Sequence, residues 1–261
     1  MPARFDGAEG RGWRLYHGDC LPILHALPDA CLDAVITDPP YSSGGWTAAS
    51  RRRDPSKKYH ASDAQPTFAG DQRDQRGYSA WCREWMGECY RALRPDRGFL
   101  CFTDWRQLPT MSDSVQAAGF VWRGVVVWDK TEACRPQPNG FRNQTEFIVY
   151  ATKGGIPSIE PRVYLPGVIR CPAPRERVHM TEKPLGLLTE LMRIVPMNGV
   201  ICDPFVGSGT TGEAALRVQA SFIGSEWSRD YWQEARERIA RTASCSGQSV
   251  VEMRGKPADH D

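Results

Sequence analysis

The apolar positions of this chain fall into short continuous runs and amphipathic stretches, and these patterns predict strands and helices. Residues 32–37 form an apolar run that stops at an Asp-Pro-Pro sequence. Two consecutive prolines offer no N–H to a neighbouring strand, so the run predicts a strand followed by a loop. Residues 78–93 carry aromatic, cysteine and leucine side chains at three- and four-residue spacings. This spacing predicts a helix, which we expect Pro95 to terminate.

The same two patterns continue along the rest of the chain and predict further strands and helices. The strands are expected at 98–103, 120–128, 146–151 and 200–202, with one more ending at Glu226, and the helices at 185–195, 210–218 and 228–243. Strands that alternate with helices favour the α/β class, with a mostly parallel sheet covered by helices on both faces.

Two segments follow neither pattern. Residues 42–76 contain more Lys and Arg than acidic residues, and residues 152–178 are basic and rich in Pro and Gly. We expect one domain over residues 1–243 that carries these segments as insertions, the first as a mobile loop. Residues 244–261 are polar, which predicts a frayed tail.

Composition excludes several classes of protein. The 261 residues include 33 Lys and Arg against 31 Asp and Glu, a net charge of +2, which excludes a polybasic binder and an acidic solubilising domain. Hydrophobic residues make up 41%, enough for one large core. No apolar stretch approaches the roughly 20 residues of a membrane span, and the start lacks a secretory pattern, so we expect a cytoplasmic protein. Nine cysteines without a C-x-x-C pair argue against disulfides and against a metal site.

The segment from Gly207 to Gly212 matches the dinucleotide fingerprint G-x-G-x-x-G, and Glu226 follows at the next strand end. Taken alone, it suggests a nicotinamide cofactor. Asp203 argues otherwise, because its carboxylate would repel a pyrophosphate. A ligand with an ammonium group and a sulfonium but no phosphate, such as S-adenosylmethionine, suits the carboxylate better. The alternative is a tight turn that binds no ligand.

The second motif is Asp38-Pro39-Pro40-Tyr41. An exocyclic amine on adenine or cytosine is a poor nucleophile, because its lone pair is delocalised into the ring. Acceptors aimed at its N–H bonds stabilise the charge that develops on methyl transfer, and Asp38 and a proline carbonyl can act as these acceptors. Tyr41 can stack on a base rotated out of the duplex. The alternative is a rigid turn with a core tyrosine.

With both motifs present, the chain resembles the DNA amino-methyltransferases that act on adenine N6 or cytosine N4. Their marks are D/S-P-P-Y and D-P-F-x-G-S-G-T-T, found here from Asp38 and from Asp203, in the order of the β class. The resemblance covers about residues 14–243. It implies a Rossmann-like S-adenosylmethionine-dependent methyltransferase fold with a small target-recognition insertion at 152–178. It also implies methylation of a flipped adenine without a covalent intermediate, with cytosine N4 as the alternative.

The resemblance also implies a set of cofactor-binding residues. Asp19 and Cys20 match a segment that contacts the cofactor's adenine, although a helix N-cap is an equally good local explanation for Asp19. Lys183 matches a lysine near the methionine carboxylate, and a solvated lysine before a helix is the alternative. The full expected set is Asp19, Cys20, Lys183, Asp203, Phe205, Gly207, Ser208, Gly209, Thr210 and Glu226.

Double-stranded DNA is the implied partner. Candidates for phosphate or base contact are Trp46, Arg51, Arg52, Arg53, Lys57, Lys58, Asn139, Arg142 and Asn143, although a solvated loop is the simpler explanation for any one of them. Segments around Lys130 and Glu146 resemble strands that flank the base pocket. Ser42 departs from the family, because many adenine enzymes have Asn there. The short recognition segment favours specificity shared with 42–76 or with the second subunit of a homodimer.

Other classes of protein explain fewer of these residues. A non-catalytic DNA-binding module and a nicotinamide-dependent oxidoreductase each account for one motif only. Carbon-5 methylation of cytosine needs a nucleophilic thiol, typically in a Pro-Cys pair, and the chain has no such dipeptide.

Overall fold

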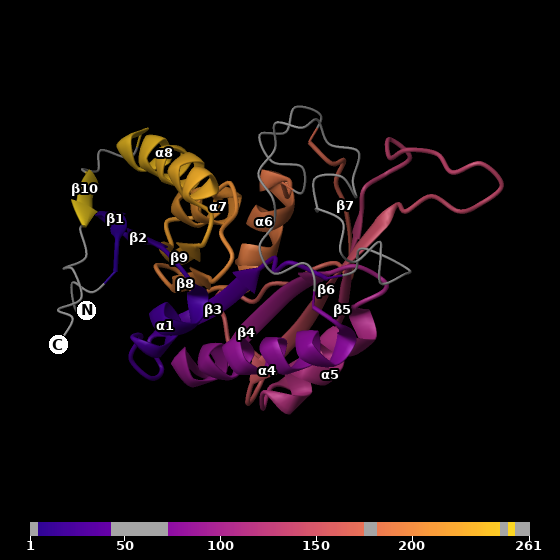
Figure 1. Ribbon diagram of the computed structural model, residues 1–261, viewed down its shortest axis with the longest axis horizontal. Coiled ribbons are helices and arrows are strands. Elements are labelled where there is room, and N and C mark those ends of the chain that lie inside the picture. The colour runs from indigo at the N-terminus through magenta and orange to yellow at the C-terminus, as the bar shows by residue number, and fades with distance from the viewer. Residues whose placement is uncertain (1–4, 43–72, 175–181, 246–249, 254–261) are drawn as a thin grey trace.

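The computed structural model describes residues 5–42, 73–174, 182–245 and 250–253. In this part of the chain ten strands form one sheet, in the order β10-β1-β2-β9-β8-β3-β4-β6-β5-β7 (Figure 1). The strands are β1 (Gly7–Gly10), β2 (Trp13–His17), β3 (Leu32–Thr37), β4 (Leu93–Thr103), β5 (Val121–Asp129), β6 (Thr145–Lys153), β7 (Val168–Arg170), β8 (Val200–Asp203), β9 (Ser221–Glu226) and β10 (Val250–Met253). The helices are α1 (Cys20–His25), α4 (Gln75–Ala92), α5 (Leu108–Ala117), α6 (Leu185–Leu191), the 3-10 turn η1 (Met192–Ile194), α7 (Thr210–Arg217) and α8 (Arg229–Cys245).

The centre of the sheet is parallel and its margins are mixed. β2, β9, β8, β3 and β4 are parallel neighbours, whereas β6 runs antiparallel between β4 and β5, and β1 is antiparallel to β2 and β10. Helices α1, α4 and α5 lie on one face of the sheet and α6, α7 and α8 on the other (Figure 1). The predicted α/β class with a mostly parallel sheet is therefore confirmed.

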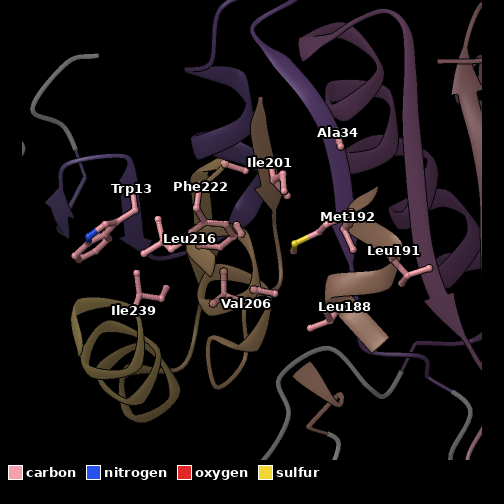
Figure 2. Packing of buried hydrophobic residues seen from close by; sticks show 14 of the residues in the cluster. Trp13, Ala34, Leu188, Leu191, Met192, Ile201, Val206, Leu216, Phe222 and Ile239 are labelled. Carbon is pink, nitrogen blue, oxygen red and sulfur yellow. The ribbon is translucent and has the colours of Figure 1, made fainter. Parts of the chain in front are cut away.

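Helices on both faces explain why the central strands are mostly apolar and largely buried. Every residue of β3 is buried, as expected for a parallel strand covered on both sides. On one face Tyr78 and Trp85 of α4 pack into the core. On the other face Trp13, Phe222 and Ile239 pack together between the sheet and α8 (Figure 2). Each such buried side chain contributes about 1.5–3 kcal/mol of hydrophobic stabilisation.

Helix α4 ends at Ala92, before Pro95, as predicted, but two other expectations about element ends are wrong. Strand β4 begins at Leu93 and not at residue 98, so Pro95 lies inside it, in an irregular stretch where the register between β3 and β4 shifts. A proline is tolerated there because no ladder N–H is required of it. The end of the chain also does not simply fray, since β10 pairs with the open edge of β1. A free strand edge offers unpaired backbone groups to such a segment.

The chain order of the strands reverses between β3 and β8. From β3 the sheet continues outward to β4, and from β8 it continues to β9 in the opposite direction. In open α/β sheets the crevice outside the carboxyl ends at such a point is where ligands bind. Thr37 ends β3, Asp203 ends β8 and Glu226 ends β9, so the candidate motifs meet at this edge.

No helix in the described ranges is long and apolar enough to cross a membrane.

Candidate active site

Asp203 joins the two strands at the reversal point. Its Oδ1 accepts hydrogen bonds from the Thr37 hydroxyl at 2.7 Å and from the Phe205 N–H at 3.0 Å. The side chain is almost fully buried, and this burial raises the pKa of Asp203 to about 6. Because the carboxylate is held by internal donors, it fixes the turn after β8 and presents its charge to a ligand from behind that turn.

The glycine-rich turn needs two of its glycines for different reasons. Gly207 has φ +54° and Gly209 has φ +89°, both in the left-handed region that favours glycine. A Cβ on Gly209 would lie 2.7 Å from the Cα of Ala235 on α8, so this position permits close packing of turn and helix. A Cβ on Gly207 would meet nothing within 4 Å. The backbone at Gly207 is therefore open to a ligand.

Glu226 closes the other side of this turn. Its Oε2 accepts from the Gly207 N–H at 2.9 Å and its Oε1 from the Ser228 N–H at 2.8 Å. Burial raises the pKa of Glu226 to about 7, partly offset by these backbone donors, and the nearby charge of Asp203 raises it further. Each carboxylate oxygen keeps a lone pair for a further donor, such as a ribose hydroxyl.

Asp19 lies at the adjacent strand end. Its Oδ1 accepts from the Leu21 N–H at 2.9 Å and caps α1, which is the local role that the sequence allowed as an alternative. The preceding Gly18 donates its N–H to the Glu226 carbonyl at 2.9 Å, so the two strand ends are in contact. Cys20 is buried beneath them, and this burial raises the pKa of its thiol far above the usual value. The thiol is therefore not a nucleophile at neutral pH.

Phe205 is held by aromatic side chains of α4. Its ring centroid lies 5.4 Å from that of Trp81 and 5.1 Å from that of Trp85. The half-buried ring thus packs the turn after β8 against α4, which covers the face of the sheet opposite to α7.

These residues fit a cofactor without phosphate better than a dinucleotide. The edge carries three carboxylates, on Asp19, Asp203 and Glu226, and burial raises the pKa values of the last two. A cationic ligand would offset the negative charge of these groups, whereas a pyrophosphate would add to it. The open backbone at Gly207 and the remaining lone pairs of Glu226 are available to such a cationic ligand.

The Asp38 carboxylate is bound on both oxygens. Tyr41 donates its hydroxyl to Oδ1 at 2.5 Å, and Lys183 donates its ammonium group to Oδ2 at 2.5 Å. Burial raises the pKa of Asp38 and Lys183 opposes that shift, with a raised pKa as the result. Pro39 and Pro40 form the rigid link that lets Tyr41 fold back onto Asp38.

Lys183 contacts Asp38, although the sequence suggested either a place near the methionine carboxylate or a solvated lysine before a helix. The solvated alternative is wrong, because Lys183 is buried. The side chain is 7% exposed, and its Nζ lies 3.4 Å from Oε2 of Glu146 on β6. Lys130 donates to Oε1 of the same glutamate at 3.2 Å. Glu146 was suggested only as part of a strand near the base pocket; an acidic residue in an otherwise apolar strand is the signal that marks it.

Arg238 of α8 is a contact of the glycine-rich turn that the sequence did not suggest. Its guanidinium donates to the Thr210 hydroxyl at 2.6 Å, to Ser208 Oγ at 3.3 Å and to Glu182 Oε1 at 2.5 Å. Glu182 precedes Lys183, so one side chain links the turn to the segment that carries the lysine. Arg238 lies three residues after Ala235, which packs on Gly209, so the two residues share a helix face. Sequence alone does not show that this face contacts the turn.

The loop between β5 and β6 leaves the sheet at the carboxyl end of β5, which is the edge where Asp38 lies. Arg142 donates to the carbonyl oxygen of Cys134 at 3.3 Å, and Asn139 and Asn143 are exposed. Phe141, which the sequence did not mark, is 97% exposed. The candidates Trp46, Arg51, Arg52, Arg53, Lys57 and Lys58 lie outside the described residues.

In the described parts of the chain, no group of three or more His, Cys, Asp or Glu residues could hold a metal ion.

Comparison with known proteins gives consistent matches. The sequence model of a protein family described as DNA methylase matches residues 32–167 and 158–237. The chain is 29% identical over 228 residues to YubD of Escherichia coli (strain K12), a presumed methylase, covering 87% of this chain and 90% of YubD. It is 24% identical over 256 residues to the type II methyltransferase M2.MboI of Moraxella bovis, covering 88% and 89% of the two chains.

Solved structures share the fold. The M1.HpyAVI–S-adenosylmethionine complex matches with a TM-score of 0.62 and 24% identity, covering 87% of this chain and 98% of the other. The cytosine-N4-specific PvuII DNA methyltransferase matches with a TM-score of 0.67 and 16% identity, covering 91% and 88%. The predicted Rossmann-like methyltransferase fold is therefore confirmed.

Proposed function

The chain belongs to the DNA methylase family and is an S-adenosylmethionine-dependent DNA methyltransferase, and on this premise we propose that it methylates the N6 amine of adenine. The cofactor supplies an electrophilic methyl group on its sulfonium. The observation that carries the proposal is the Asp38–Tyr41 motif, which lies beside the glycine-rich turn at the reversal point of the sheet.

Asp38 is the proposed acceptor for one N–H of the amine, and the carbonyl of a motif proline is the acceptor for the other. Both acceptors draw the nitrogen lone pair out of conjugation with the ring. As the N–CH3 bond forms, the S–CH3 bond of the cofactor breaks and S-adenosylhomocysteine leaves as a neutral thioether. Positive charge develops on the nitrogen, and the ionised Asp38 stabilises it until the nitrogen loses its extra proton to solvent. No residue of the chain forms a covalent bond to the base.

Tyr41 supports the base. Its ring packs against the apolar core and its hydroxyl binds Asp38, so its orientation is fixed before the base arrives. A target amine inside a duplex is out of reach, so the nucleotide must rotate out of the stack, and Tyr41 offers a face on which the base stacks.

The cofactor is held by the neighbouring strand ends. Glu226 accepts hydrogen bonds from the ribose hydroxyls, and Asp19 with the backbone at Cys20 contacts the adenine. The open backbone at Gly207 approaches the ligand closely, and Asp203 supplies negative charge near its cationic groups. Ser208, Gly209, Thr210 and Phe205 shape this turn.

Asp at the first position of the Asp-Pro-Pro-Tyr motif favours adenine in the family, whereas Ser favours cytosine N4. Ser42, which follows Tyr41, is the departure that keeps cytosine N4 as the alternative substrate. The arginines and lysines of 42–76 and the β5–β6 loop are the proposed contacts to the DNA backbone.

Replacement of Asp38 by Ala tests the role of the motif. We expect methyl transfer to fall by about two orders of magnitude or more, the loss typical of a charge-stabilising acceptor, while cofactor binding is retained. Incorporation of a radiolabelled methyl group into DNA measures the first quantity and calorimetry the second. Asp113→Ala, at an exposed position on α5, is the matched control and should behave as the parent. Turnover of D38A close to that of the parent would remove Asp38 from the mechanism.

A further inference from the structure

Four buried or half-buried charges alternate in sign at the base of the active site. Lys130 donates to Glu146 at 3.2 Å, Glu146 lies 3.4 Å from Lys183, and Lys183 donates to Asp38 at 2.5 Å. The side chains come from the ends of β3, β5 and β6 and from the segment before α6. The four charges sum to zero, so the row is neutral as a unit.

This arrangement limits Asp38 as an acceptor. Its two oxygens already accept from Tyr41 and Lys183. A carboxylate paired with an ammonium group at 2.5 Å has little negative charge left to stabilise a second cation. The amine of the target base therefore competes with Lys183 for Asp38.

Glu146 is a second carboxylate that can bind the Lys183 ammonium group. Its Oε2 is buried and has no hydrogen-bond partner in the described part of the structure, although Lys183 Nζ lies 3.4 Å away. A shift of Lys183 by roughly half an ångström would bring this contact to the 2.7–2.9 Å of a charge-assisted hydrogen bond. The empty lone pair and the close ammonium group thus define a second binding position for the same cation.

We propose that Glu146 is a positioning residue that receives the Lys183 ammonium group when the target amine binds Asp38. Lys130 keeps the opposite oxygen of Glu146 oriented for this exchange. The inference rests on the proposed function, because it requires Asp38 to accept from an amine. Lys183 stays protonated throughout and moves only between the two carboxylates.

The pKa values of Glu146 and Lys183 agree with a movement of the ammonium group between the two carboxylates. Burial alone would raise the pKa of Glu146, but Lys183 and Lys130 outweigh it and hold the pKa below its usual value. Burial alone would lower the pKa of Lys183, but Asp38 and Glu146 raise it. Both groups are therefore charged at neutral pH. The negative charge of Glu146 also raises the pKa of Asp38. The other titratable groups near this row are Tyr41, Cys101 and Asp203.

Glu146→Gln in the full chain tests the inference, because it keeps the shape of the side chain and removes its charge. Single-turnover methyl transfer at saturating DNA and cofactor should slow about tenfold or more, because Lys183 stays on Asp38. Cofactor affinity should stay within about twofold of the parent. The acidic limb of the pH–rate profile should move to lower pH, because Asp38 loses a negative neighbour and ionises more easily.

Two further variants distinguish positioning from a structural role. Glu146→Asp keeps the charge, and we expect it to restore part of the rate and the parental acidic limb even if Glu146→Gln fails to fold. Glu88→Gln is the matched control on α4. The Glu88 side chain is 20% exposed against 21% for Glu146, and it pairs with Arg91 at 2.9 Å away from the site. Its rate and pH profile should equal those of the parent.

The outcomes separate this inference from the proposed function. A parental rate in E146Q, a slower rate with an unmoved acidic limb, or an E146D variant as slow as E146Q would each overturn the role of Glu146. Those results would leave the proposed function intact, provided that the parent methylates DNA and D38A does not. Failure of the parent to transfer a methyl group would remove both.

Discussion

Glu226 shows how burial changes the ionisation of a single residue. Its carboxylate sits at the end of β9 with only backbone N–H donors to offset its burial, and its pKa is about 7. The free protein therefore holds this group close to half-protonated at neutral pH. A ligand whose hydroxyl groups donate to the carboxylate, and whose sulfonium and ammonium groups are positive, favours the ionised form.

This ionisation predicts a pH-dependent cofactor affinity. Because the ionised form binds, affinity should weaken about fourfold from pH 8 to 6.5, as protons compete for a group of pKa about 7. Calorimetric titration of S-adenosylmethionine across this range measures the change. Glu226→Gln should bind more weakly and lose this component, so that only the smaller contribution of Asp203, whose pKa is about 6, and the titration of the cofactor's own amine remain. Equal pH slopes in the parent and in E226Q would contradict the role of Glu226.

At the scale of elements, α8 holds the glycine-rich turn in place. Gly209 packs on the backbone of Ala235, and Arg238 of the same helix face binds Thr210 and Glu182. The helix thereby fixes both the glycine-rich turn and the segment that carries Lys183. A single guanidinium can bridge the two because its donors form a planar fork.

Replacement of Arg238 by Ala should loosen both segments. We expect cofactor affinity to fall about tenfold and the melting temperature to drop by several degrees, because partly buried acceptors lose a charged donor. Arg238→Lys should recover little, because one ammonium cannot take the place of the fork. Arg241→Ala, exposed on the same helix, serves as the control in calorimetry and thermal denaturation. Parental affinity in R238A would show that the turn holds its shape without α8.

The β5–β6 loop is the second element that bears on function. It leaves the sheet at the carboxyl end of β5, on the edge where Asp38 lies, and it carries the exposed ring of Phe141 together with Arg142 and Asn143. An exposed aromatic side chain beside positive charge suits contact with unstacked bases.

Phe141→Ala should therefore weaken DNA binding. The loss of one stacking contact predicts a decrease in affinity of about tenfold, with cofactor affinity unchanged. Fluorescence anisotropy with a labelled duplex measures the change. Met197→Ala is the matched control, because Met197 is 80% exposed and precedes β8, at the opposite edge of the sheet. Equal affinities of F141A, M197A and the parent would place the DNA elsewhere.

At the scale of the whole molecule, local patterns located the strand ends but not the contacts between them. The apolar runs before Asp38 and Asp203 predicted β3 and β8, because strands buried on both faces are mostly apolar. The pairing of Asp38 with Lys183, 145 residues apart, has no local signature. It arises because the fold brings the segment before α6 to the end of β3.

The margins of the sheet escaped prediction for a similar reason. β1 consists of Gly-Ala-Glu-Gly and lacks an apolar pattern, and β10 forms against its free edge. Such strands depend on backbone pairing with a neighbour that is distant in sequence. The contacts of Glu146 and Arg238 are likewise with residues that are distant in sequence. The sequence could thus predict the chemistry of the motifs, whereas the positioning residues required the structure.

Direct identification of the methylated nucleoside tests whether this chain transfers a methyl group from S-adenosylmethionine to adenine N6. Unmethylated duplex DNA is incubated with the protein and with cofactor that carries an isotope-labelled methyl group, then digested to nucleosides and analysed by mass spectrometry. We expect the label to appear in N6-methyldeoxyadenosine with the parent and to be lost with D38A. Label in N4-methyldeoxycytidine would contradict the choice of adenine, and label in neither nucleoside would contradict the proposed function.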